Sequence, residues 1–408
     1  MSRFLFVVPP LVGHINPAVG VAAELAARGH RTAWAALPEA IAPLAGPEAE
    51  IHPCAVLPSA DRTAPPGPLD EAYRRPPDLR GTAALKYLWE GFLIPLADAM
   101  APGIEAAIAR FRPDVLVVDQ QAVAGALVAE RHGLPWATCA TTSAEFTGAL
   151  AGLPLVEAWI RGLLDGLRGR IGAPGRTTDP RFSPHLVLAF TTPELTGPAT
   201  IDRPIRFVGP AIAPRPTEPP FPWEWLDPGR ATALVTLGTA NADTGTAFLT
   251  ACHRAVQERS HRLQTVIADP GHALGAPPPD ADVLVLPTVP QLRLLEHLDA
   301  VVCHAGHNTV CESLWHGVPL VVAPIRDDQP VVAGQVAASG AGIRVRFGRP
   351  DATRLGRALD EVIDNAAHRA AARRIGDSFR AAGGAAAAAT HLERLTRPLP
   401  EPVEEPPR

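Results

Sequence analysis

The chain has 408 residues, of which 47% are hydrophobic and 19% charged, and its formal net charge is -5. This balance is typical of a globular protein rather than a disordered one, and it lacks the strong positive charge expected of a nucleic-acid-binding protein. The length exceeds what one ordinary core supports, so two domains of roughly 200 residues each are expected.

Cysteine usage and the N-terminus indicate the compartment. The five cysteines are scattered and form no CxxC pair, which predicts buried thiols in a reducing cytoplasm rather than disulfides. The apolar N-terminal run is interrupted by Pro9-Pro10 and by GHINP (13–17), which favours a buried first strand over a signal peptide. No apolar run reaches the roughly 18 residues of a membrane span. We therefore expect a cytoplasmic protein without a membrane span.

Strands alternate with helices in the first half of the chain. The predicted strands are RFLFVVPP (3–10), HRTAWAAL (30–37), DVLVVD (114–119), LPWATCA (134–140), HLVLAF (185–190) and RPIRFVGP (203–210). Helical patterns occupy 15–29, 82–111 and 121–132, with mixed helical character over 143–183. Asn16-Pro17 marks the expected start of the first helix, since proline is tolerated at the first helical position. The proline-rich stretch 58–80 predicts a long surface loop.

A second alternating series follows a proline-rich linker at 211–225. Its predicted strands are ATALVTLGT (231–239), RLQTVIAD (262–269), DVLVLPTV (282–289), AVVCHAG (300–306), PLVVAPI (319–325) and GIRVRF (342–347). The alanine-rich segment 366–396 is predicted to be helical apart from a break at Gly383-Gly384, and the tail 397–408 to be disordered.

Two parallel sheets follow from this alternation, because a parallel strand pair needs a crossover helix. The fold class is α/β, with residues 1–210 as the first domain, 226–396 as the second, and the last helices free to pack back on the first. Ligands of open α/β sheets bind beyond the carboxyl ends of the strands. The loops that follow the strands are therefore expected to face one cleft between the domains.

One of these loops predicts an anion site. Residues 304–319, HAGHNTVCESLWHGVP, lead from an apolar strand through small polar residues into a helix. The first backbone N–H groups of a helix have no internal partner, and the helix dipole adds partial positive charge there.

Three motifs at these spacings give the chain a resemblance. They are HAGHNTVCE (304–312), GVP (317–319) and DQP (328–330), accompanied near the N-terminus by VGHINP (12–17). The chain resembles the GT-B-fold, inverting, nucleotide-sugar-dependent glycosyltransferases, in particular bacterial members of the UDP-glycosyltransferase family that glycosylate macrolides and other natural products. The likeness extends to about residue 396. It implies two Rossmann-like doubly wound domains facing across a cleft, with the acceptor on residues 1–210 and the nucleotide sugar on 226–396.

The resemblance also implies a donor site in the second domain. His304, Gly306, Asn308 and Thr309 would hold the diphosphate, with His307 as a further candidate, and Glu312 would accept hydrogen bonds from the ribose. The pair Asp328 and Gln329 would bind the sugar hydroxyls. The remaining expected contacts are to the base from Val289 and Gln291, and to the phosphates or sugar from Gly238 and Thr239.

His14 falls on the family's catalytic base, in the motif G-H-x-N-P. An imidazole titrates near neutrality, so it can take a proton from an acceptor hydroxyl. It needs a partner that fixes its tautomer and stabilises the imidazolium, and Asp119, at the end of a neighbouring strand, is expected to be that partner.

The sequence departs from the family in two places. Thr288 stands where many relatives have tryptophan, which weakens base stacking, and Ala305 stands where many have glycine. The alanine is a mild change if its position does not need a positive φ. Asp280-Ala281-Asp282 is similar to a metal-binding DxD motif, but it precedes a strand at the sheet edge away from the cleft. It is interpreted as a loop, and no metal is expected.

The predicted protein is therefore a metal-independent, inverting hexosyltransferase of secondary metabolism, such as antibiotic biosynthesis. It would move a sugar from a UDP- or dTDP-sugar to a hydroxyl of a largely apolar natural product. It would need no cofactor and no nucleic acid, and homodimerisation is left open. The alternatives are a non-catalytic nucleotide-sugar-binding accessory protein and a nucleotide-sugar epimerase of the same architecture. The chain carries no GxGxxG after its first strand and no P-loop, which weakens a dehydrogenase or a P-loop nucleotidase.

Overall fold

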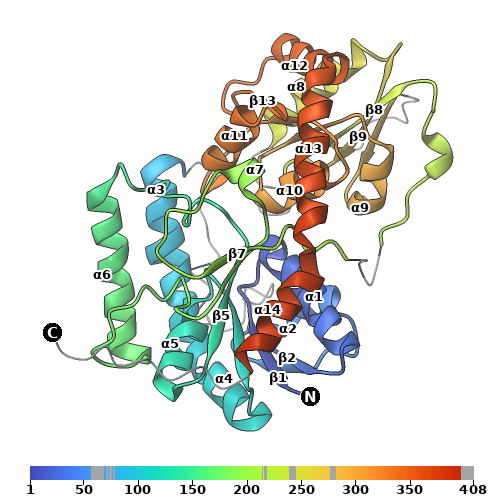
Figure 1. Cartoon of the computed structure of the whole chain (residues 1–408). Coiled ribbons are helices and arrows are strands. Elements are labelled where there is room, and N and C mark those ends of the chain that lie inside the picture. The colour runs from blue at the N-terminus through green and yellow to red at the C-terminus, as the bar shows by residue number, and fades with distance from the viewer. Residues whose placement is uncertain are drawn as a thin grey trace, which may run out of the picture.

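Two parallel sheets, each covered by helices on both faces, form the two halves of the molecule (Figure 1). The structure is a computed structural model, and it describes residues 1–56, 69, 72, 76, 79–213, 215, 218–238, 245–275 and 282–396. The predicted α/β fold class is confirmed. Most of the proline-rich stretch 58–80, part of the linker and the tail 397–408 lie outside the described residues.

The first sheet has seven parallel strands in the order β3-β2-β1-β4-β5-β6-β7. The strands are β1 (Arg3–Val7), β2 (Arg31–Ala36), β3 (Ile51–Pro53), β4 (Val115–Asp119), β5 (Trp136–Ala140), β6 (Val187–Ala189) and β7 (Ile205–Phe207). In β1, Leu5 and Val7 pack into the core on one face, whereas Phe4 and Phe6 pack into the core on the other. Burial on both faces explains why these strands are continuous apolar runs rather than alternating ones.

Helices between these strands cover the two faces of the sheet. They are α1 (Val12–Ala27), α2 (Pro38–Ala45), α3 (Gly81–Lys86), the π-helical turn η1 (Tyr87–Leu93), α4 (Ile94–Phe111), α5 (Val123–His132), α6 (Pro154–Ile171) and α7 (Pro193–Thr196). Helix α1 begins four residues before Asn16, because the main-chain N–H groups of His14 and Ile15 already bond to the carbonyl of Leu11. The expected helix start at Asn16-Pro17 is wrong. His14 therefore stands in the first turn of a helix rather than in a loop.

The second sheet has six parallel strands in the order β10-β9-β8-β11-β12-β13. They are β8 (Ala231–Thr236), β9 (Leu263–Ala268), β10 (Val283–Leu286), β11 (Ala300–Cys303), β12 (Leu320–Val322) and β13 (Gly342–Arg344). The helices of this half are η2 (Trp223–Trp225), α8 (Thr246–Gln257), α9 (Gln291–Leu294), η4 (Leu295–His297), α10 (His307–Trp315), α11 (Gln329–Ala338), α12 (Ala352–Asp364), α13 (Ala366–Ala382) and α14 (Gly384–Leu395).

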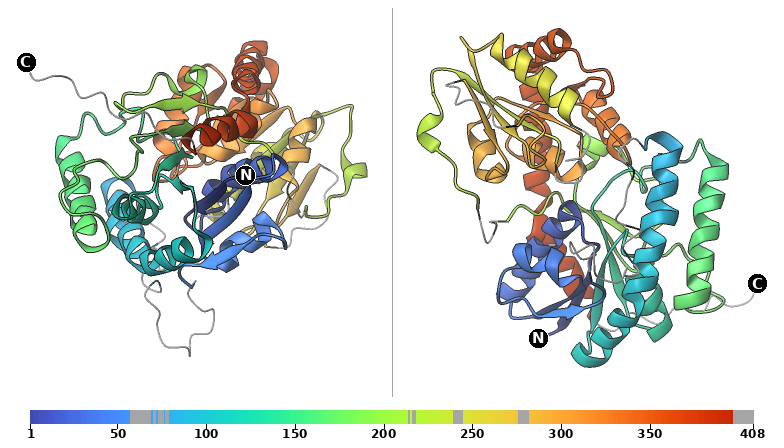
Figure 2. Two further views of the ribbon diagram at one scale, coloured as in Figure 1. Left: turned by 60° about the horizontal axis from the view of Figure 1, so that its bottom comes forward. Right: turned by 180° about the vertical axis from the view of Figure 1, so that it is seen from behind.

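The last helix returns to the first half of the molecule. Gly383 and Gly384 both adopt positive φ, which breaks the alanine-rich segment between α13 and α14. Helix α14 then packs along α1, and both views in Figure 2 show the red helix beside the blue one. Arg28 of α1 donates to Glu393 and Thr390 at 3.0 and 2.9 Å. The C-terminal helix thus fastens the two halves together.

The continuous helix from Gly81 to Phe111 is long and apolar enough to span a membrane by length and composition, which the sequence analysis did not anticipate. Half of its most apolar window is buried. Met100 and Ile104 are fully buried in the core cluster beside the first sheet, so this helix is packed as a core helix of the first half.

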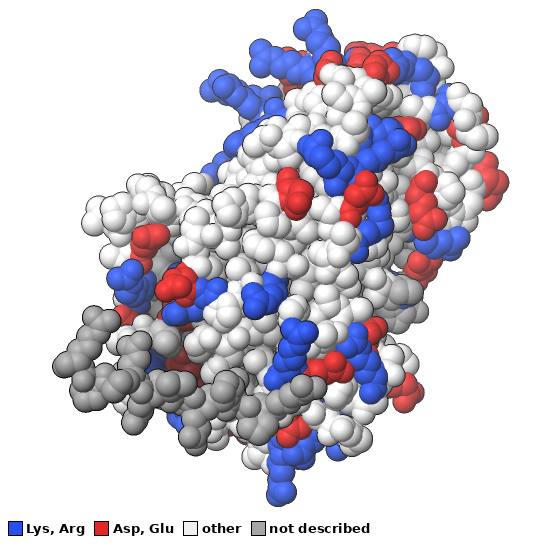
Figure 3. Space-filling model, viewed as in Figure 1, with Lys and Arg blue, Asp and Glu red and all other residues white. Residues whose placement is uncertain are grey.

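Charged side chains of both signs are interspersed on the face shown in Figure 3, and a broad uncharged area crosses its middle.

Candidate active site

The centre of the cleft on the first half is a histidine–aspartate pair. Nδ1 of His14 lies 3.0 Å from both carboxylate oxygens of Asp119. Asp119 ends β4, which lies beside β1, and His14 follows β1, so neighbouring parallel strands bring the two side chains together. The carboxylate is completely buried, and its Oδ1 also accepts the main-chain N–H of Gln121 at 2.8 Å. The imidazole keeps 15% of its surface exposed.

The negative charge of Asp119 stabilises the protonated form of the His14 imidazole. Burial alone lowers the pKa of His14, but the charge and hydrogen bond of Asp119, with help from Asp328 and Glu145, raise it above its ordinary value. Nδ1 faces the carboxylate, so the other ring nitrogen is directed elsewhere. In the part of the chain that the structure describes, no partner is recorded for Nε2 of His14.

A threonine that the sequence analysis did not identify completes the pair. The hydroxyl of Thr141 donates to Oδ2 of Asp119 at 2.7 Å, and its oxygen lies 2.7 Å from Nδ1 of His14. Thr141 follows β5, the neighbour of β4 in the sheet. The segment TTS (141–143) after a strand next to Asp119 was the signal for it, since carboxyl ends of adjacent parallel strands share one edge.

The side chains of the next two residues form hydrogen bonds across the cleft. The hydroxyl of Thr142 donates to Asp328, and Ser143 donates to the side-chain oxygen of Gln335 at 2.7 Å. Asp328 and Gln335 belong to the second half, at and within α11. Burial raises the pKa of Asp328, and Asp327 adds to that shift, although the hydrogen bond from Thr142 opposes it. Two side-chain hydrogen bonds thus hold the two halves together beside His14.

A second carboxyl group lies near the pair. Glu145 is partly buried and accepts a hydrogen bond of 3.2 Å from Gln120. Burial raises its pKa to about 7, and the charge of Arg181 opposes this shift while Asp179 and Asp119 support it. The sequence did not predict that Glu145 lies near His14, because the loop after β5 has no regular pattern.

On the second half, His304 occupies a slot between two glycines. A Cβ placed on Gly306 would lie 2.3 Å from Nε2 of His304, and one placed on Gly238 would lie 2.7 Å from its Cε1. Gly306 has an ordinary extended φ of -62°, so it is required for space rather than for conformation. Gly238 has a positive φ of 70° and is required for both.

The two histidines of this loop have the opposite electrostatics to His14. Burial lowers the pKa of His304 to about 4, with a contribution from the charge of Arg326. Burial also lowers the pKa of His307 to about 4. Both rings are therefore neutral near pH 7. His307 lies 3.5 Å from Sγ of Cys311 and next to the main chain of Phe190, so its contacts are with the protein.

Ala305 differs from the sequence-based expectation. It adopts a positive φ of 65°, a conformation that glycine takes readily and alanine does not. The alanine is therefore not the mild change that was considered in the sequence, because this position does need a positive φ. Its methyl group is fully buried in the core of the second half.

Glu312 lies at the centre of a hydrogen-bonded cluster. Its Oε1 accepts from Asn308 at 2.8 Å and from Arg215 at 2.7 Å, and its Oε2 accepts from Gln291 at 2.6 Å. Asn308 is one helical turn before Glu312 in α10, Gln291 begins α9, and Arg215 comes from the linker. Thr309, in the first turn of α10, is partly buried. Three of the expected donor-site residues, Glu312, Asn308 and Gln291, are thus brought together. Arg215 is a fourth member of the cluster, which the sequence did not indicate.

The remaining expected donor-site residues have distinct positions. The side-chain oxygen of Gln329 accepts from the main-chain N–H groups of Ile325 and Arg326 at 2.9 and 3.1 Å, so it shapes the loop that carries Asp328. Only its amide N–H groups remain for a ligand. Val289 packs at the edge of the core of the second half. Thr239 lies outside the described residues, as do Asp280 and Ala281, whereas Asp282 forms an ion pair with Arg230.

Comparison with known proteins identifies the family. The chain is 31% identical to 4'-demethylrebeccamycin synthase of Lentzea aerocolonigenes, over 97% of its own length and 99% of that protein. It belongs to the natural-product glycosyltransferases. A second relative of this glycosyltransferase is the demethyllactenocin mycarosyltransferase of Streptomyces fradiae, at 31% identity over 98% of this chain and 87% of that protein.

Solved structures agree with the GT-B fold of the glycosyltransferase. The glycotransferase of kitacinnamycin superimposes with a TM-score of 0.74 at 25% identity, covering 97% of this chain and 98% of the other. The calicheamicin glycosyltransferase CalG4 superimposes with a TM-score of 0.73 at 24% identity and the same coverage. A family model described as erythromycin biosynthesis protein CIII-like, C-terminal domain, matches residues 263–395.

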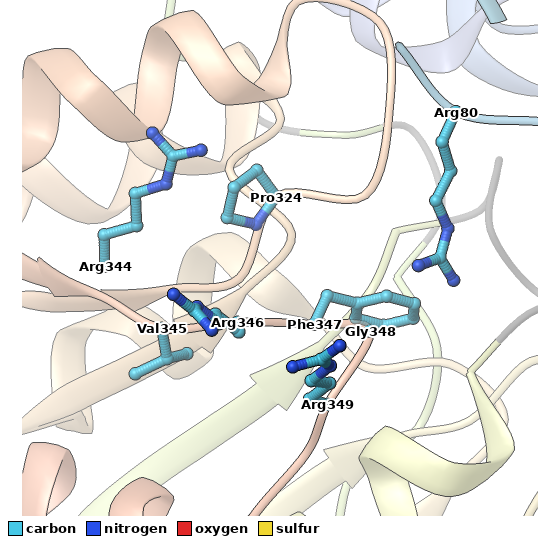
Figure 4. Close-up of a pocket in the computed structure, with 8 residues that line it drawn as sticks. All are labelled: Arg80, Pro324, Arg344, Val345, Arg346, Phe347, Gly348 and Arg349. Carbon is cyan, nitrogen blue, oxygen red and sulfur yellow. The ribbon is translucent and has the colours of Figure 1, made fainter. Parts of the chain in front are cut away.

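A basic cavity of about 320 Å³ lies on the glycosyltransferase between residues 344–349, at the end of β13 and after it, and Pro324 of the loop after β12. Figure 4 shows Arg80 of the first half approaching the segment after β13, where Gly348 leaves room for its guanidinium. The cavity is lined by Arg80, Pro324, Arg344, Val345, Arg346, Phe347, Gly348 and Arg349. Among the described residues, none of its four arginines has a carboxylate partner. The cavity therefore places positive charge at the start of the loop that leads to Asp328.

Proposed function

We propose that this glycosyltransferase moves a sugar, with inversion at the anomeric carbon, from a UDP- or dTDP-sugar to a hydroxyl of a largely apolar natural product. The observation that carries the proposal is the buried Asp119 carboxylate bonded to Nδ1 of His14, with Nε2 directed elsewhere. Nothing in the proposed reaction needs a metal ion or a further cofactor.

The pair supplies the base. With its proton on Nδ1, His14 uses the lone pair of Nε2 to accept the proton of the acceptor hydroxyl while the oxygen attacks the anomeric carbon. The bond from that carbon to the diphosphate oxygen breaks in the same step. The proton stays on His14, and the adjacent Asp119 and the raised pKa of the imidazole favour this charged product.

The second half stabilises the leaving group. Negative charge accumulates on the diphosphate as the bond breaks, so donors fixed in advance lower the barrier. The N-terminus of α10, with Thr309 in its first turn, offers unpaired backbone N–H groups and the positive end of a helix dipole. His304 is neutral near pH 7, so it would act as a hydrogen-bond donor rather than as a cation.

The donor is oriented by carboxylates. Glu312 would accept from the ribose, and Gln291 links it to the loop expected to hold the base. Asp328 would bind sugar hydroxyls; it faces Thr142 across the cleft and is one of the charges that act on His14. The contacts of Thr142 and Ser143 across the cleft would exclude water, which competes with the acceptor as a nucleophile.

The acceptor would bind the first half. The exposed large hydrophobic side chains of the described residues all belong to this half: the terminal Met1, Val12, Val56, Leu153 and Leu155. Val12 is in the same helical turn as His14. Exposed apolar side chains next to a catalytic group suit an apolar acceptor. The proline-rich stretch 58–80 and the helical regions 82–111 and 143–183 would contribute the rest of that surface.

The relatives support the donor class. One relative is named for the synthesis of 4'-demethylrebeccamycin and the other for mycarosyl transfer, and two superimposable structures, VinC and SsfS6, were solved with thymidine diphosphate (dTDP). A cytoplasmic location would suit such donors, and the five cysteines are buried and free.

Sugar transfer by His14→Ala tests the mechanism. The purified chain is incubated with UDP- and dTDP-sugars and a panel of apolar hydroxyl acceptors, and products are measured by mass spectrometry. We expect kcat to fall by roughly 10³-fold in His14→Ala, within the range of general-base effects, with unchanged affinity for the nucleotide. His253→Ala, a change on α8, is the matched control. Transfer by His14→Ala at the wild-type rate, or retention of the anomeric configuration, would contradict the proposal.

A further inference from the structure

The carboxylate of Glu312 is almost fully occupied by the protein itself. Arg215, Asn308 and Gln291 donate to it at 2.7, 2.8 and 2.6 Å. An ionised carboxylate accepts at about four lone-pair positions. Both positions on Oε1 are taken, and Gln291 takes one of the two on Oε2. One acceptor position is left.

The number of free positions matters for the nucleotide. A ribose presents two neighbouring hydroxyl groups, on C2′ and C3′, whereas a 2′-deoxyribose presents only the 3′-hydroxyl. One hydroxyl fits the one free position on Glu312. A second hydroxyl requires that one of the three protein donors leaves.

Of the three hydrogen-bond donors to Glu312, Arg215 determines how many ribose hydroxyls the carboxylate can accept. Gln291 and Asn308 belong to α9 and α10 of the second half, whereas Arg215 belongs to the linker. We infer that Arg215, by occupying Oε1 of Glu312, makes the donor site selective for 2′-deoxyribonucleotide sugars over ribonucleotide sugars. This inference rests on the proposed function, in which Glu312 binds the ribose.

The linker holds Arg215 in this position. Ala211 and Ala213 pack against α1, where a Cβ on Gly20 would lie 3.3 and 3.5 Å from their methyl groups. Arg215 and Glu312 line a cavity of only about 50 Å³ together with Asn16 of α1. The guanidinium is 29% exposed and the carboxylate 4% exposed, so the ion pair is partly shielded from water. The surroundings therefore favour Arg215 at Oε1.

Displacing Arg215 by a hydroxyl also removes the cation from the carboxylate. A hydroxyl bonded to an ionised carboxylate still forms a charge-assisted hydrogen bond, but it does not neutralise the charge, and a buried carboxylate that loses its cation is costly. A 2′-hydroxyl cannot replace the positive charge. The ribonucleotide must either lose the arginine contact or leave its own hydroxyl unpaired.

Calorimetric titration of UDP, dUDP and dTDP into the full chain separates the effect of the 2′-hydroxyl on affinity from the effect of the base methyl group. The pair UDP and dUDP differs only in the 2′-hydroxyl, and the pair dUDP and dTDP only in the methyl group of the base. We expect the wild type to bind dUDP about 10-fold more tightly than UDP, the scale of one charge-assisted hydrogen bond. In Arg215→Ala this ratio should fall to about twofold or less, mainly because UDP binds more tightly.

Two further variants complete the experiment. Arg215→Lys keeps a cation and should retain most of the discrimination. Arg354→Ala removes an exposed arginine on α12 and should leave the ratio unchanged, which controls for net charge. Melting temperatures of all variants check that the linker change leaves the fold intact.

The outcomes separate the inference from the proposed function. If the wild type binds dUDP and UDP equally, or if Arg215→Ala keeps the wild-type ratio, the role of Arg215 is overturned while the proposed function stands. If the wild type binds none of the three nucleotides, both fail.

Discussion

A strand–helix junction that carries a histidine occurs on each side of the cleft, and the pKa of the histidine is shifted in opposite directions on the two sides. A parallel strand leads into a helix at β1–α1 and again at β11–α10, and a histidine stands at each junction. His14 meets a buried carboxylate, and its pKa is raised. His304 meets glycines, and burial lowers its pKa to about 4. The strand–helix junctions bring the rings of His14 and His304 to the cleft, but the groups that contact each ring determine whether its protonated or its neutral form is favoured.

The comparison teaches what each side requires. A base must be able to hold a proton as a cation, so its loop is joined to Asp119 on the neighbouring strand. A hydrogen-bond donor to a diphosphate must approach it closely, so the loop of His304 is built of small residues, and no carboxylate of the described residues is bonded to this ring. Substitutions on one side at a time test this difference.

The largest effect is expected from Asp119→Asn. The amide is isosteric but uncharged, so His14 loses the charge that raises its pKa, and an amide NH2 group facing the ring would donate to Nδ1 and favour the wrong tautomer. We expect kcat to fall by about 10²- to 10⁴-fold, and the acidic limb of the pH–rate profile to move to lower pH. Steady-state kinetics between pH 5 and 9 measure both.

Thr141→Val is the matched control for this change. It removes one hydrogen bond to Asp119 but keeps the carboxylate, so it should cost far less activity. An unshifted pH profile in Asp119→Asn would show that His14 does not titrate in the reaction.

The pH dependence of stability should separate the histidines on the two sides. His304 and His307 have lowered pKa values of about 4, so the unfolded chain takes up their protons first as the pH falls below 6.5. The free energy of unfolding should therefore decrease between pH 6.5 and 4, by on the order of 3 kcal/mol per histidine. For His14 the sign is reversed, because its raised pKa gives stability that is present at low pH and lost as the pH rises through the folded value.

Urea unfolding at pH 7, 6 and 5 tests this difference in sign. His307→Leu should flatten the loss of stability on acidification, since one of the two buried rings is gone. His14→Gln should make the loss steeper. The same change of slope in both variants would contradict the contrast between the two loops.

The glycines of the two motifs should also respond differently. Gly306→Ala places a Cβ 2.3 Å from the His304 ring, so we expect a loss of about 1–3 kcal/mol in stability and weaker nucleotide binding. Gly13→Ala in α1 places its Cβ 3.9 Å from that of Asn308, an ordinary contact. Because alanine favours a helix, Gly13→Ala should be neutral or stabilising by up to about 1 kcal/mol.

Thermal unfolding with and without dTDP measures both glycine variants. Equal melting temperatures for the two would mean that the His304 ring has space on the Gly306 side, which would contradict the tight packing of Gly306 against that ring.

Much of the fold could be predicted from the sequence, and the reason is local. Both sheets are buried on both faces, so their strands are continuous apolar runs that stand out between glycine and proline breaks. The pair His14 and Asp119 was predicted from the resemblance of VGHINP to the family motif, together with the position of Asp119 at the end of a strand. The start of α1 was missed because Pro17 indicates a helix start, whereas the chain tolerates it six residues into the helix.

The rest of the site depends on contacts between distant segments, which no local pattern encodes. Arg215 is separated from Glu312 by 97 positions and lies in a linker whose composition indicates only stiffness. Thr142 and Asp328 meet only because the two halves close on each other. The backbone conformation of Ala305 was equally hidden, because an alanine gives no sign of a positive φ.

That hidden conformation gives the smallest expected effect. Ala305→Gly relieves a left-handed conformation that costs an alanine about 1 kcal/mol, but it also removes a buried methyl group and makes the unfolded chain more flexible. We expect a net change within about 1 kcal/mol, towards higher stability. Ala341→Gly, in the same core but without a positive φ, should be destabilising by about 1 kcal/mol. Urea midpoints compare the two, and an equal loss in both would show that the loop before α10 carries no strain at Ala305.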